Sequence, residues 1–270
     1  MGSPKIGKSW LSLDMCIAVA VSGELFGKIT IDSRGEALYL ALEDNWRRLQ
    51  QRMKSRLAGM DAPQSLHFCI QWERGPSGAE KLDSWLLQHP DCRLVVIDTL
   101  AKFRNPKNAR ADVYEQDYAA LSPLVPIAAA RHVAIVIVHH TRKGEADDDL
   151  EVISGSQGLA ACVDNILIMR RERYTQNATL SVTGRDIDKE QVYGMTWNEE
   201  AKRWEITSSG REAFLSAEMQ RVLAAVKEHQ PIGSRDLAAV LFPGTAILRD
   251  SKEWRHACRY LAKLADAGLV

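Results

Sequence analysis

The residues with the clearest chemical potential stand at the start of the chain, where Gly2 to Ser9 spell the pattern G-x-x-x-x-G-K-S. In a loop of this kind the glycines let backbone N–H groups turn inward around phosphates, while the lysine reaches the outer phosphate oxygens. The serine hydroxyl holds Mg²⁺, and a helix starting at about Lys8 adds the positive end of its dipole. The pattern predicts a phosphate-binding loop; the alternative is a glycine-rich turn.

Polar side chains follow three apolar runs of the type found in buried parallel strands. They are Glu43 and Asp44 after residues 37–42, Asp98 after residues 93–97, and His139 and His140 after residues 133–138. Ligands of an open α/β sheet bind at the carboxyl ends of its strands. We therefore expect these side chains to gather beside the phosphate loop.

Each of these groups suits a step in phosphoryl transfer to water. Asp98 would ligate Mg²⁺ directly or at one remove, although an aspartate at a strand end can also cap a helix. Glu43 is the candidate for orienting or deprotonating the attacking water, and Asp44 could equally be a capping residue. His139 or His140 would sense the γ-phosphate and report its loss to the loop that follows; the alternative is an ordinary hydrogen-bonded histidine.

These groups need a framework of alternating helices and strands, which the spacing of apolar residues predicts. Helices are expected over residues 8–21, 45–57, 78–88 and 112–131, the last interrupted around Pro123 and Pro126, and strands over residues 37–42, 66–71, 93–98 and 133–138. This order predicts a parallel sheet covered on both faces. A phosphate loop normally follows a buried strand, which is absent from this sequence, so we expect the natural start to lie upstream.

The second half of the chain changes character. A short helix over residues 158–162 and antiparallel strands are expected first, and three helices follow; the strands are at residues 165–170, 179–183, 192–197 and 204–206, and the helices at residues 216–228, 234–241 and 252–267. We predict a larger domain over residues 1–207, a linker over residues 208–215 and a small domain over residues 216–270. Both domains are expected to be cut short at their outer ends.

Composition is that of an ordinary globular chain of 270 residues with 35 basic and 35 acidic side chains. With no net charge, no global field draws the protein toward nucleic acid or membrane, so any such binding must be local. The five cysteines are scattered and read as reduced core residues of a cytoplasmic protein rather than a disulfide frame or a metal site. No apolar run approaches the roughly 20 residues that cross a bilayer.

The order of the motifs resembles the RepA-like branch of the RecA-type ATPases, which includes hexameric replicative helicases of plasmids and phages and AAA family ATPases of mobile elements. The resemblance covers about residues 1–206; the matching segments are Gly2 to Leu11, Tyr39 to Asp44, Val96 to Thr99, Val138 to Lys143, Gly155-Ser156 and Gly184 to Asp186. It implies an α/β fold with a RecA-like, mostly parallel sheet flanked by helices, here without its first strand, and an antiparallel extension.

The resemblance also implies a ring of six subunits with ATP and Mg²⁺ bound between neighbours. Nucleotide would be held by Gly2, Pro4, Lys5, Gly7, Lys8, Ser9 and Trp10, the metal by Ser9 and Asp98, and hydrolysis would use Glu43 as the base and His140 or His139 as the sensor. Arg185 matches the arginine finger that enters the neighbouring subunit, where a guanidinium offsets transition-state charge. The alternative for Arg185 is a surface ion pair with Asp186 or Asp188.

Two further segments bear on nucleic acid. Residues 142–154 match the central-channel loop that grips single-stranded DNA, with Arg142 and Lys143 as its contacts, but the five acids of this segment argue against tight phosphate binding. The chain from residue 216 resembles a winged-helix domain. Its last helix carries Lys252, Arg255, Arg259 and Lys263 at helical spacing. These residues, Arg255 and Arg259 in particular, favour contact with DNA; a solvated helix face is the alternative.

Three functions follow as hypotheses. The first is a DNA-dependent ATPase motor, a RepA-like hexameric helicase acting in replication or recombination. The second is a regulatory or DNA-binding RecA-type ATPase of a mobile element that does not unwind DNA. The third is a small-molecule or protein kinase, ranked last because kinases that use this loop need an acceptor-binding lid rather than an arginine finger.

Overall fold

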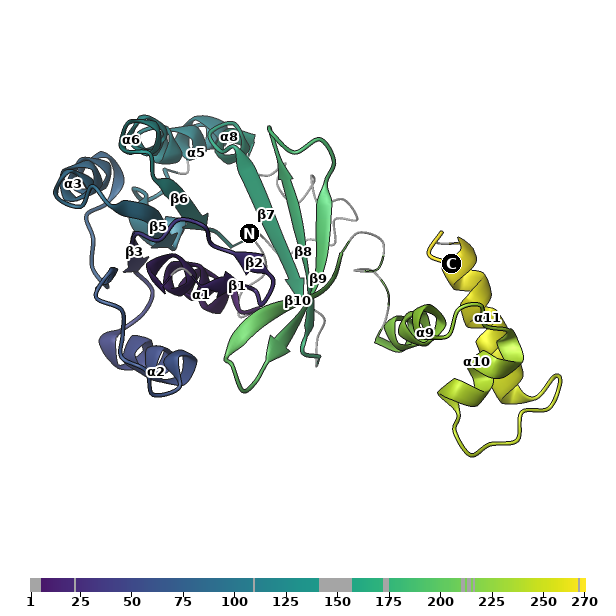
Figure 1. Ribbon diagram of the computed structural model, residues 1–270. Coiled ribbons are helices and arrows are strands. Elements are labelled where there is room, and N and C mark those ends of the chain that lie inside the picture. The colour runs from purple at the N-terminus through teal and green to yellow at the C-terminus, as the bar shows by residue number, and fades with distance from the viewer. Residues whose placement is uncertain are drawn as a thin grey trace. The chain divides into compact units, whose positions relative to one another are not determined.

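The protein is described here from a computed structural model that covers residues 6–21, 23–108, 110–140, 157–171, 175–209, 212, 215, 217–266 and 268–270. The chain divides into two compact units, drawn separately in Figure 1. The N-terminal unit consists of Met1–Gln191 and Met195–Ile206, and the C-terminal unit of Val192–Gly194 and Thr207–Val270.

A four-stranded parallel sheet forms the centre of the N-terminal unit. Its order is β4-β3-β5-β6, and its strands are β3 (Glu36–Ala41), β4 (Leu66–Cys69), β5 (Cys92–Asp98) and β6 (Ala134–Val138). All three pairings are parallel, so the carboxyl ends of these strands lie along one edge. The predicted parallel sheet is confirmed.

Helices cover both faces of this sheet, as Figure 1 shows. They are α1 (Lys8–Val21) and α2 (Trp46–Leu57) on one face and α3 (Gly75–Gln88), α5 (Val113–Leu121) and α6 (Leu124–Arg131) on the other. Successive strand residues point to opposite faces. Accordingly, Tyr39 packs with Leu13 of α1, whereas Leu38 packs with Leu82 of α3. The continuous apolar runs of the sequence are thus explained by burial on both sides.

Local signals set the helix boundaries. Asn45 caps α2 by accepting a hydrogen bond from the backbone of Arg48, and Asp112 caps α5 in the same way through Glu115. The predicted interruption near Pro123 separates α5 from α6. Two elements were not expected from the sequence: a small hairpin of β1 (Glu24–Leu25) and β2 (Ile29–Thr30), and the short helix α4 (Leu100–Phe103).

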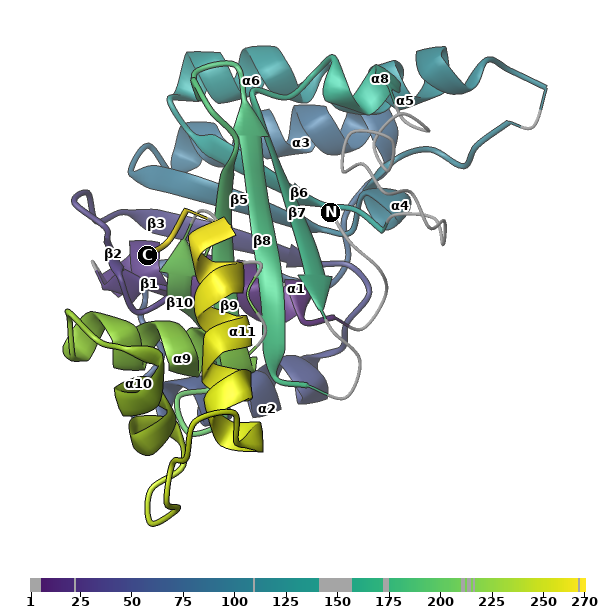
Figure 2. The ribbon, with the colours of Figure 1, turned by 90° about the vertical axis from the view of Figure 1, so that its right-hand side faces the viewer.

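A second sheet follows the short helix α8 (Gln157–Ala160). Its order is β10-β9-β8-β7, with strands β7 (Asn165–Arg171), β8 (Asn177–Gly184), β9 (Gln191–Asn198) and β10 (Arg203–Ser209). Its first pair, β7 and β8, is antiparallel, and these two strands run side by side in Figure 2. The predicted antiparallel extension is therefore present.

Three helices dominate the C-terminal unit: α9 (Ala217–Glu228), α10 (Ser234–Leu241) and α11 (Lys252–Asp266). Their apolar faces meet in one core that includes Val222, Leu237, Ala257 and Leu264. The bounds of α10 match the prediction at both ends. The winged-helix interpretation of this unit stays a prediction.

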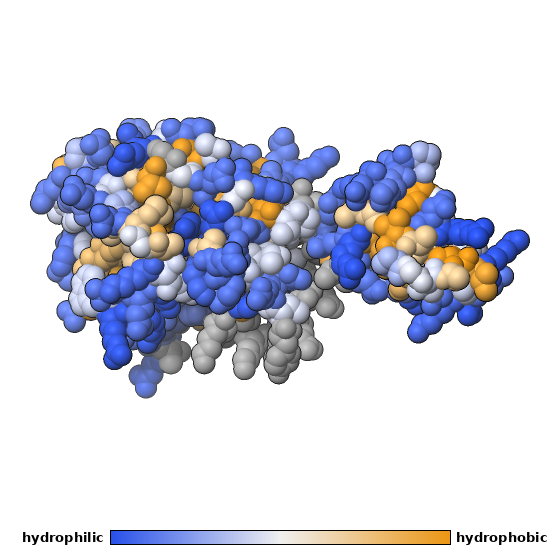
Figure 3. Space-filling model, turned by 60° about the horizontal axis from the view of Figure 1, so that its bottom comes forward, coloured by the Kyte–Doolittle hydropathy of each residue, from blue (hydrophilic) through white to orange (hydrophobic). Residues whose placement is uncertain are grey.

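The surface agrees with the balanced charge of the sequence. On the face drawn in Figure 3, hydrophilic side chains cover most of the N-terminal unit and hydrophobic ones gather in a few separate areas. All five cysteines are free thiols. Within the described residues, every helix is too short or too polar to cross a membrane.

Candidate nucleotide site at the carboxyl edge of the parallel sheet

The end of the phosphate loop has the geometry that the motif requires. Gly7 has a φ of 101°, a conformation that residues with a Cβ rarely adopt. Its carbonyl accepts the amides of Trp10 and Leu11 at 3.1 and 3.0 Å, which starts α1. Gly2, Pro4 and Lys5 lie outside the described residues, and the described part of the loop begins at Ile6.

Lys8 is the buried cation of the site. Only 8% of its surface is exposed, and its Nζ lies 3.0 Å from Nδ1 of His140. Burial lowers the pKa of Lys8 to about 8, although the carboxylates of Asp98 and Glu43 act in the opposite direction. The two acids and His140 thus surround the lysine, as the sequence predicted. An amine held this way gains from an incoming anion, because the anion would restore its favoured charge.

Asp98, at the end of β5, is nearly as buried, with 6% of its surface exposed. The Tyr39 hydroxyl donates a hydrogen bond to Asp98 Oδ2 at 2.7 Å and reaches the Ser9 carbonyl oxygen at 3.4 Å. Burial, together with the charge of Asp98, raises the pKa of Tyr39 well above its usual value, so this hydroxyl keeps its proton. Tyr39 therefore links the predicted metal residues Asp98 and Ser9. Its place inside an apolar run hid this role in the sequence.

Glu43 is held by groups from the two neighbouring strands. The Thr99 hydroxyl, one residue beyond β5, donates to Glu43 Oε1 at 2.7 Å. After β6, His140 places Nε2 at 3.7 Å from Glu43 Oε2. When Lys8 is charged, it must donate to His140 Nδ1, which leaves the ring proton on Nε2, facing Glu43. Lys8, His140 and Glu43 then form a chain of alternating donors and acceptors.

Neighbouring residues of each pair are used differently. Asp44, beside Glu43, binds Arg52 at 2.6 Å and Arg48 at 3.3 Å, which ties the strand end to α2. His139 is partly buried, and burial lowers its pKa to about 4, so it is neutral at physiological pH. The contacts to Lys8 and Glu43 both belong to His140.

Aromatic side chains flank the loop on the side of the second sheet. Trp10 meets Trp197 edge to face at 5.4 Å between ring centroids, and Trp197 meets Trp204 at 5.5 Å. A Cβ on Gly7 would lie 2.7 Å from Nε1 of Trp204, so this ring closes tightly over the loop. The guanidinium of Arg52 lies 5.7 Å from the centroid of Trp10. Trp197 and Trp204 were not predicted as site residues, because only the pairing of distant strands brings them here.

Arg185 lies just beyond β8 and does not join the Lys8 cluster among the described contacts. Its Nη2 donates to the Ala161 carbonyl at 3.0 Å, and its Nη1 lies 3.5 Å from Asp164. The ion pair is therefore with Asp164, which corrects the expected alternative of Asp186 or Asp188. With 63% of its side chain exposed, Arg185 is open to solvent. Arg142 and Lys143 lie outside the described residues.

The basic residues of α11 lie on its outer face. Lys252, Arg255, Arg259 and Lys263 are exposed, while Ala257, Tyr260 and Leu264 enter the core of the C-terminal unit. The guanidinium of Arg259 and the ammonium of Lys263 lie 5.4 and 5.6 Å from the ring centroid of Tyr260. This face carries positive charge to solvent at successive helical turns.

Solved structures share the fold of this chain. The ATPase domain of one helicase matches with a TM-score of 0.60 and 12% identity over 77% of this chain and 83% of that one. A DnaB-like replicative helicase matches with a TM-score of 0.57 and 14% identity, over 76% of this chain and 57% of that one. The RadB recombinase gives a TM-score of 0.55 and 12% identity over 77% and 88%. At such identities the likeness establishes the RecA-like fold.

Comparison of sequences gives the family. No curated protein sequence matches this chain. A family model described as AAA domain matches residues 1–146, which include the phosphate loop and every strand of the parallel sheet. This match spans more than half of the 270 residues. The chain belongs to the AAA domain family and has a RecA-like fold.

Proposed function

We propose that this protein binds and hydrolyses ATP with Mg²⁺ and acts in DNA replication or recombination as a RepA-like hexameric helicase. One observation carries the ATPase part: a buried lysine, two acids and an imidazole from separate elements meet beside a phosphate loop. This set supplies an anion partner, a metal ligand, a base and a sensor within one small region.

The residues present fit MgATP by their chemistry. Gly7 is in a conformation suited to a phosphate loop, and Lys8 is a buried amine that an anion would stabilise. Ser9 and Asp98 offer the hydroxyl and carboxylate oxygens that Mg²⁺ prefers, and both are linked to Tyr39. Bound Mg²⁺ would neutralise charge that develops on the phosphate oxygens. Trp10 offers a partly exposed aromatic surface next to the loop.

Glu43 is the base in this proposal. Its hydrogen bond from Thr99 fixes one carboxylate oxygen, and the other faces His140. A carboxylate oriented in this way can align a water molecule and accept its proton. Because His140 contacts both Glu43 and Lys8, it can relate the occupancy of the phosphate site to the base. We therefore choose His140 over His139 as the sensor.

Arg185 is proposed to complete the site of a neighbouring subunit. Its exposed side chain, held among the described residues by a carbonyl and a distant carboxylate, is available to a partner. A guanidinium supplied from the next subunit would make hydrolysis depend on assembly. The helicases among the structural neighbours support the ring and the DNA substrate by their shared fold.

The decisive experiment measures ATP turnover with and without single-stranded DNA, over a range of protein concentrations. Lys8→Ala should abolish nucleotide binding, whereas Glu43→Gln and Arg185→Ala should keep binding and lose hydrolysis. Arg221→Ala, which removes an exposed arginine of α9, is the matched control and should retain full turnover. Turnover that survives in Glu43→Gln would overturn the assignment of the base.

Assembly is tested by mixing two inactive variants. A site formed by Arg185 of one subunit and Lys8 of the next is intact at some interfaces when Lys8→Ala and Arg185→Ala proteins are combined. We expect partial recovery of turnover in the mixture. Two separately inactive proteins that stay inactive when mixed, while still co-assembling by size-exclusion chromatography, would exclude the shared site.

The basic face of α11 favours a second candidate, a RecA-type ATPase of a mobile element that binds duplex DNA without unwinding it. Winged helices bind DNA through such a face. A strand-displacement assay on a forked duplex separates the two candidates. ATP-dependent displacement supports the helicase, and duplex-stimulated turnover without displacement supports the DNA-binding ATPase.

A further inference from the structure

A second cluster of chemically capable side chains lies at the opposite edge of the parallel sheet. Glu36 is the first residue of β3, His67 lies in β4, and His89 is the residue that ends α3. His67 pairs with Leu38, and Glu36 shares a face with Leu38 because side chains alternate along a strand. That face packs against α3, which delivers His89 to the same place.

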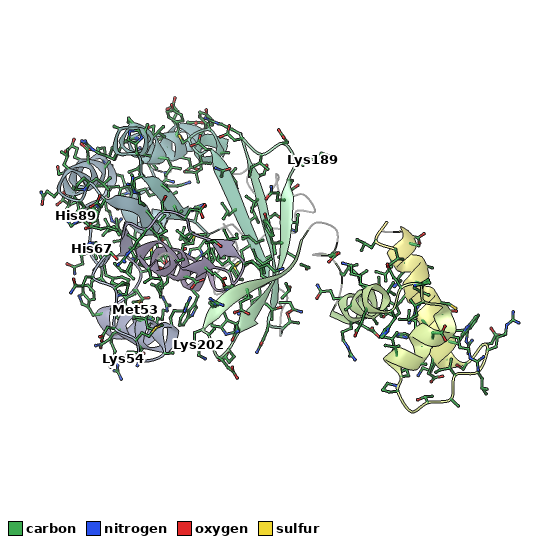
Figure 4. The ribbon with its side chains drawn as sticks, viewed as in Figure 1. Met53, Lys54, His67, His89, Lys189 and Lys202 are labelled. Carbon is green, nitrogen blue, oxygen red and sulfur yellow. The ribbon has the colours of Figure 1, made fainter. Side chains whose placement is uncertain are left out.

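Three ligand atoms converge there. One atom each from Glu36, His67 and His89 lies within 4.8 Å of the other two. Oε2 of Glu36 is 2.6 Å from Nδ1 of His89 and 3.2 Å from Nε2 of His67. The two imidazole rings meet at 4.9 Å between centroids, and His67 and His89 lie close together below α3 in Figure 4.

The hydrogen bonding of this cluster is incomplete. His89 hydrogen-bonds Glu36 through Nδ1. Nε2 of His67 is buried but makes no hydrogen bond with any residue that the structure describes, although Glu36 is near. A buried polar atom without a partner costs free energy, so a group that binds it would be favoured. The three side chains keep 26 to 31% of their surface exposed, which leaves a route for a small ion.

Aromatic packing holds the imidazoles in place. The ring of Trp85, in α3, stacks on His89 at 3.8 Å with an interplanar angle of 14°. The same ring meets His67 edge to face at 5.4 Å. Rings that are fixed before a ligand arrives lose less conformational entropy on binding it. Trp85 thus shapes the cluster although it offers no ligand.

We propose that Glu36, His67 and His89 bind a divalent transition-metal ion, with Zn²⁺ as the preferred ion. Two imidazoles and one carboxylate form a donor set that Zn²⁺ uses in three-residue sites with a fourth position for water. Tetrahedral bonds of about 2.0 to 2.1 Å place ligand atoms about 3.3 Å apart. The observed distances of 2.6 and 3.2 Å need only a small opening of the Glu36–His89 contact.

The neighbouring thiol does not join the donor set. Cys92 lies opposite Glu36 in the β3–β5 register, but its Sγ already donates to the Leu94 carbonyl. Burial raises the pKa of Cys92 to about 11, so the thiol stays protonated at neutral pH. The proposed site is therefore of the nitrogen and oxygen type.

The site would act on the framework rather than on nucleotide. It joins the start of β3, the start of β4 and the end of α3, whereas the Lys8 cluster lies beyond the other end of β3. Six strand residues separate the two edges by roughly 18 Å. A metal here should stabilise the N-terminal unit without being required for phosphate binding.

The test is titration of the chelator-treated full chain with Zn²⁺ by calorimetry and with Co²⁺ by visible absorption, both without nucleotide. One ion per chain should bind, and the Co²⁺ complex should show d–d bands of low coordination number without thiolate charge-transfer absorption. Glu36→Gln, His67→Ala and His89→Ala should each weaken binding by at least about tenfold. Zn²⁺ should raise the thermal midpoint of the unmodified protein only.

The matched control is His256→Gln. His256 Nε2 lies 3.1 Å from Glu218 in the C-terminal unit, and this histidine–carboxylate pair has no third ligand among the described residues. The control should bind both ions as the unmodified protein does. Circular dichroism and the thermal midpoint in chelator establish that each variant is folded, and Glu36→Gln preserves side-chain size if a histidine variant fails this check. Equal affinity in Glu36→Gln and the unmodified protein, or thiolate bands with Co²⁺, would overturn the proposal.

Discussion

At the scale of single residues, the site depends on charges held away from water. Lys8 is buried among Asp98, Glu43 and His140, and burial brings its pKa down to about 8. An unfolded chain would hold this proton up to a pH near 10.5. Between these values the unfolded state binds more protons, so this group makes the free protein more stable as pH rises. The site is therefore costly without an anion.

Nucleotide binding should take up protons near the pKa of Lys8. At about pH 8.5 most folded molecules carry a neutral Lys8, and the negative phosphates would restore its charge. Calorimetry in buffers of different ionisation enthalpy should show proton uptake at this pH and little uptake two pH units lower. Equal uptake at both pH values would mean that Lys8 does not face the phosphates.

Tyr39→Phe should destabilise the protein by about 1 to 3 kcal/mol, because the buried carboxylate of Asp98 loses a short hydrogen bond. The substitution conserves ring volume, so packing with α1 is kept. Urea denaturation measures the change. Tyr114→Phe, at an exposed position of α5, is the control and should change stability by less than about 0.5 kcal/mol. A similar loss in both variants would assign no special role to Tyr39.

At the scale of elements, ion pairs of different burial join the helices. Asp117 of α5 is fully buried and binds Arg104, just after α4, and Lys107. Asp83 of α3 binds Arg131 of α6 near the surface, at 2.7 Å. The first arrangement is buried and the second is exposed, so their removal should have different effects.

Asp117→Ala should cost about 3 to 5 kcal/mol, since it leaves the buried guanidinium of Arg104 without its carboxylate. Asp83→Ala should cost less than about 1 kcal/mol, because water solvates the released Arg131. Thermal and urea unfolding of the two variants measure the difference. Losses of equal size would show that burial does not set the strength of these pairs.

At the scale of the whole molecule, charge is balanced and any attraction to DNA must come from a local surface. The exposed face of α11 provides one, although the chain carries 35 basic and 35 acidic residues. Binding of phosphates by such a face releases counterions, so its affinity depends on salt. The same total charge would give no such dependence if it were evenly mixed.

Arg255→Ala and Arg259→Ala should each weaken binding to duplex DNA and reduce the slope of log affinity against log salt by about one. Fluorescence anisotropy over a salt series measures both quantities. Lys227→Ala is the control, because this lysine of α9 is already paired with Glu212 at 2.6 Å. An unchanged slope in the arginine variants would exclude α11 as the DNA contact.

Much of the fold could be predicted because its signals are local. Period-two burial and apolar runs located the strands of the parallel sheet, and Asn45 and Pro123 marked helix ends that the structure confirms. The hairpin of β1 and β2 was missed because each strand has only two residues. The cluster of Lys8, Glu43, Asp98 and His140 was expected from parallel strands that end at a common edge.

The sequence by itself determined which residues end the parallel strands, and hence which charged groups meet Lys8, because strand period and phosphate-loop chemistry are local properties. Only the tertiary structure decided that Tyr39 bridges Ser9 and Asp98, that Trp204 covers Gly7, and that His67 and His89 converge on Glu36. These contacts join residues far apart in the chain. Their partners are chosen by strand register and helix packing, which no local pattern of residues encodes.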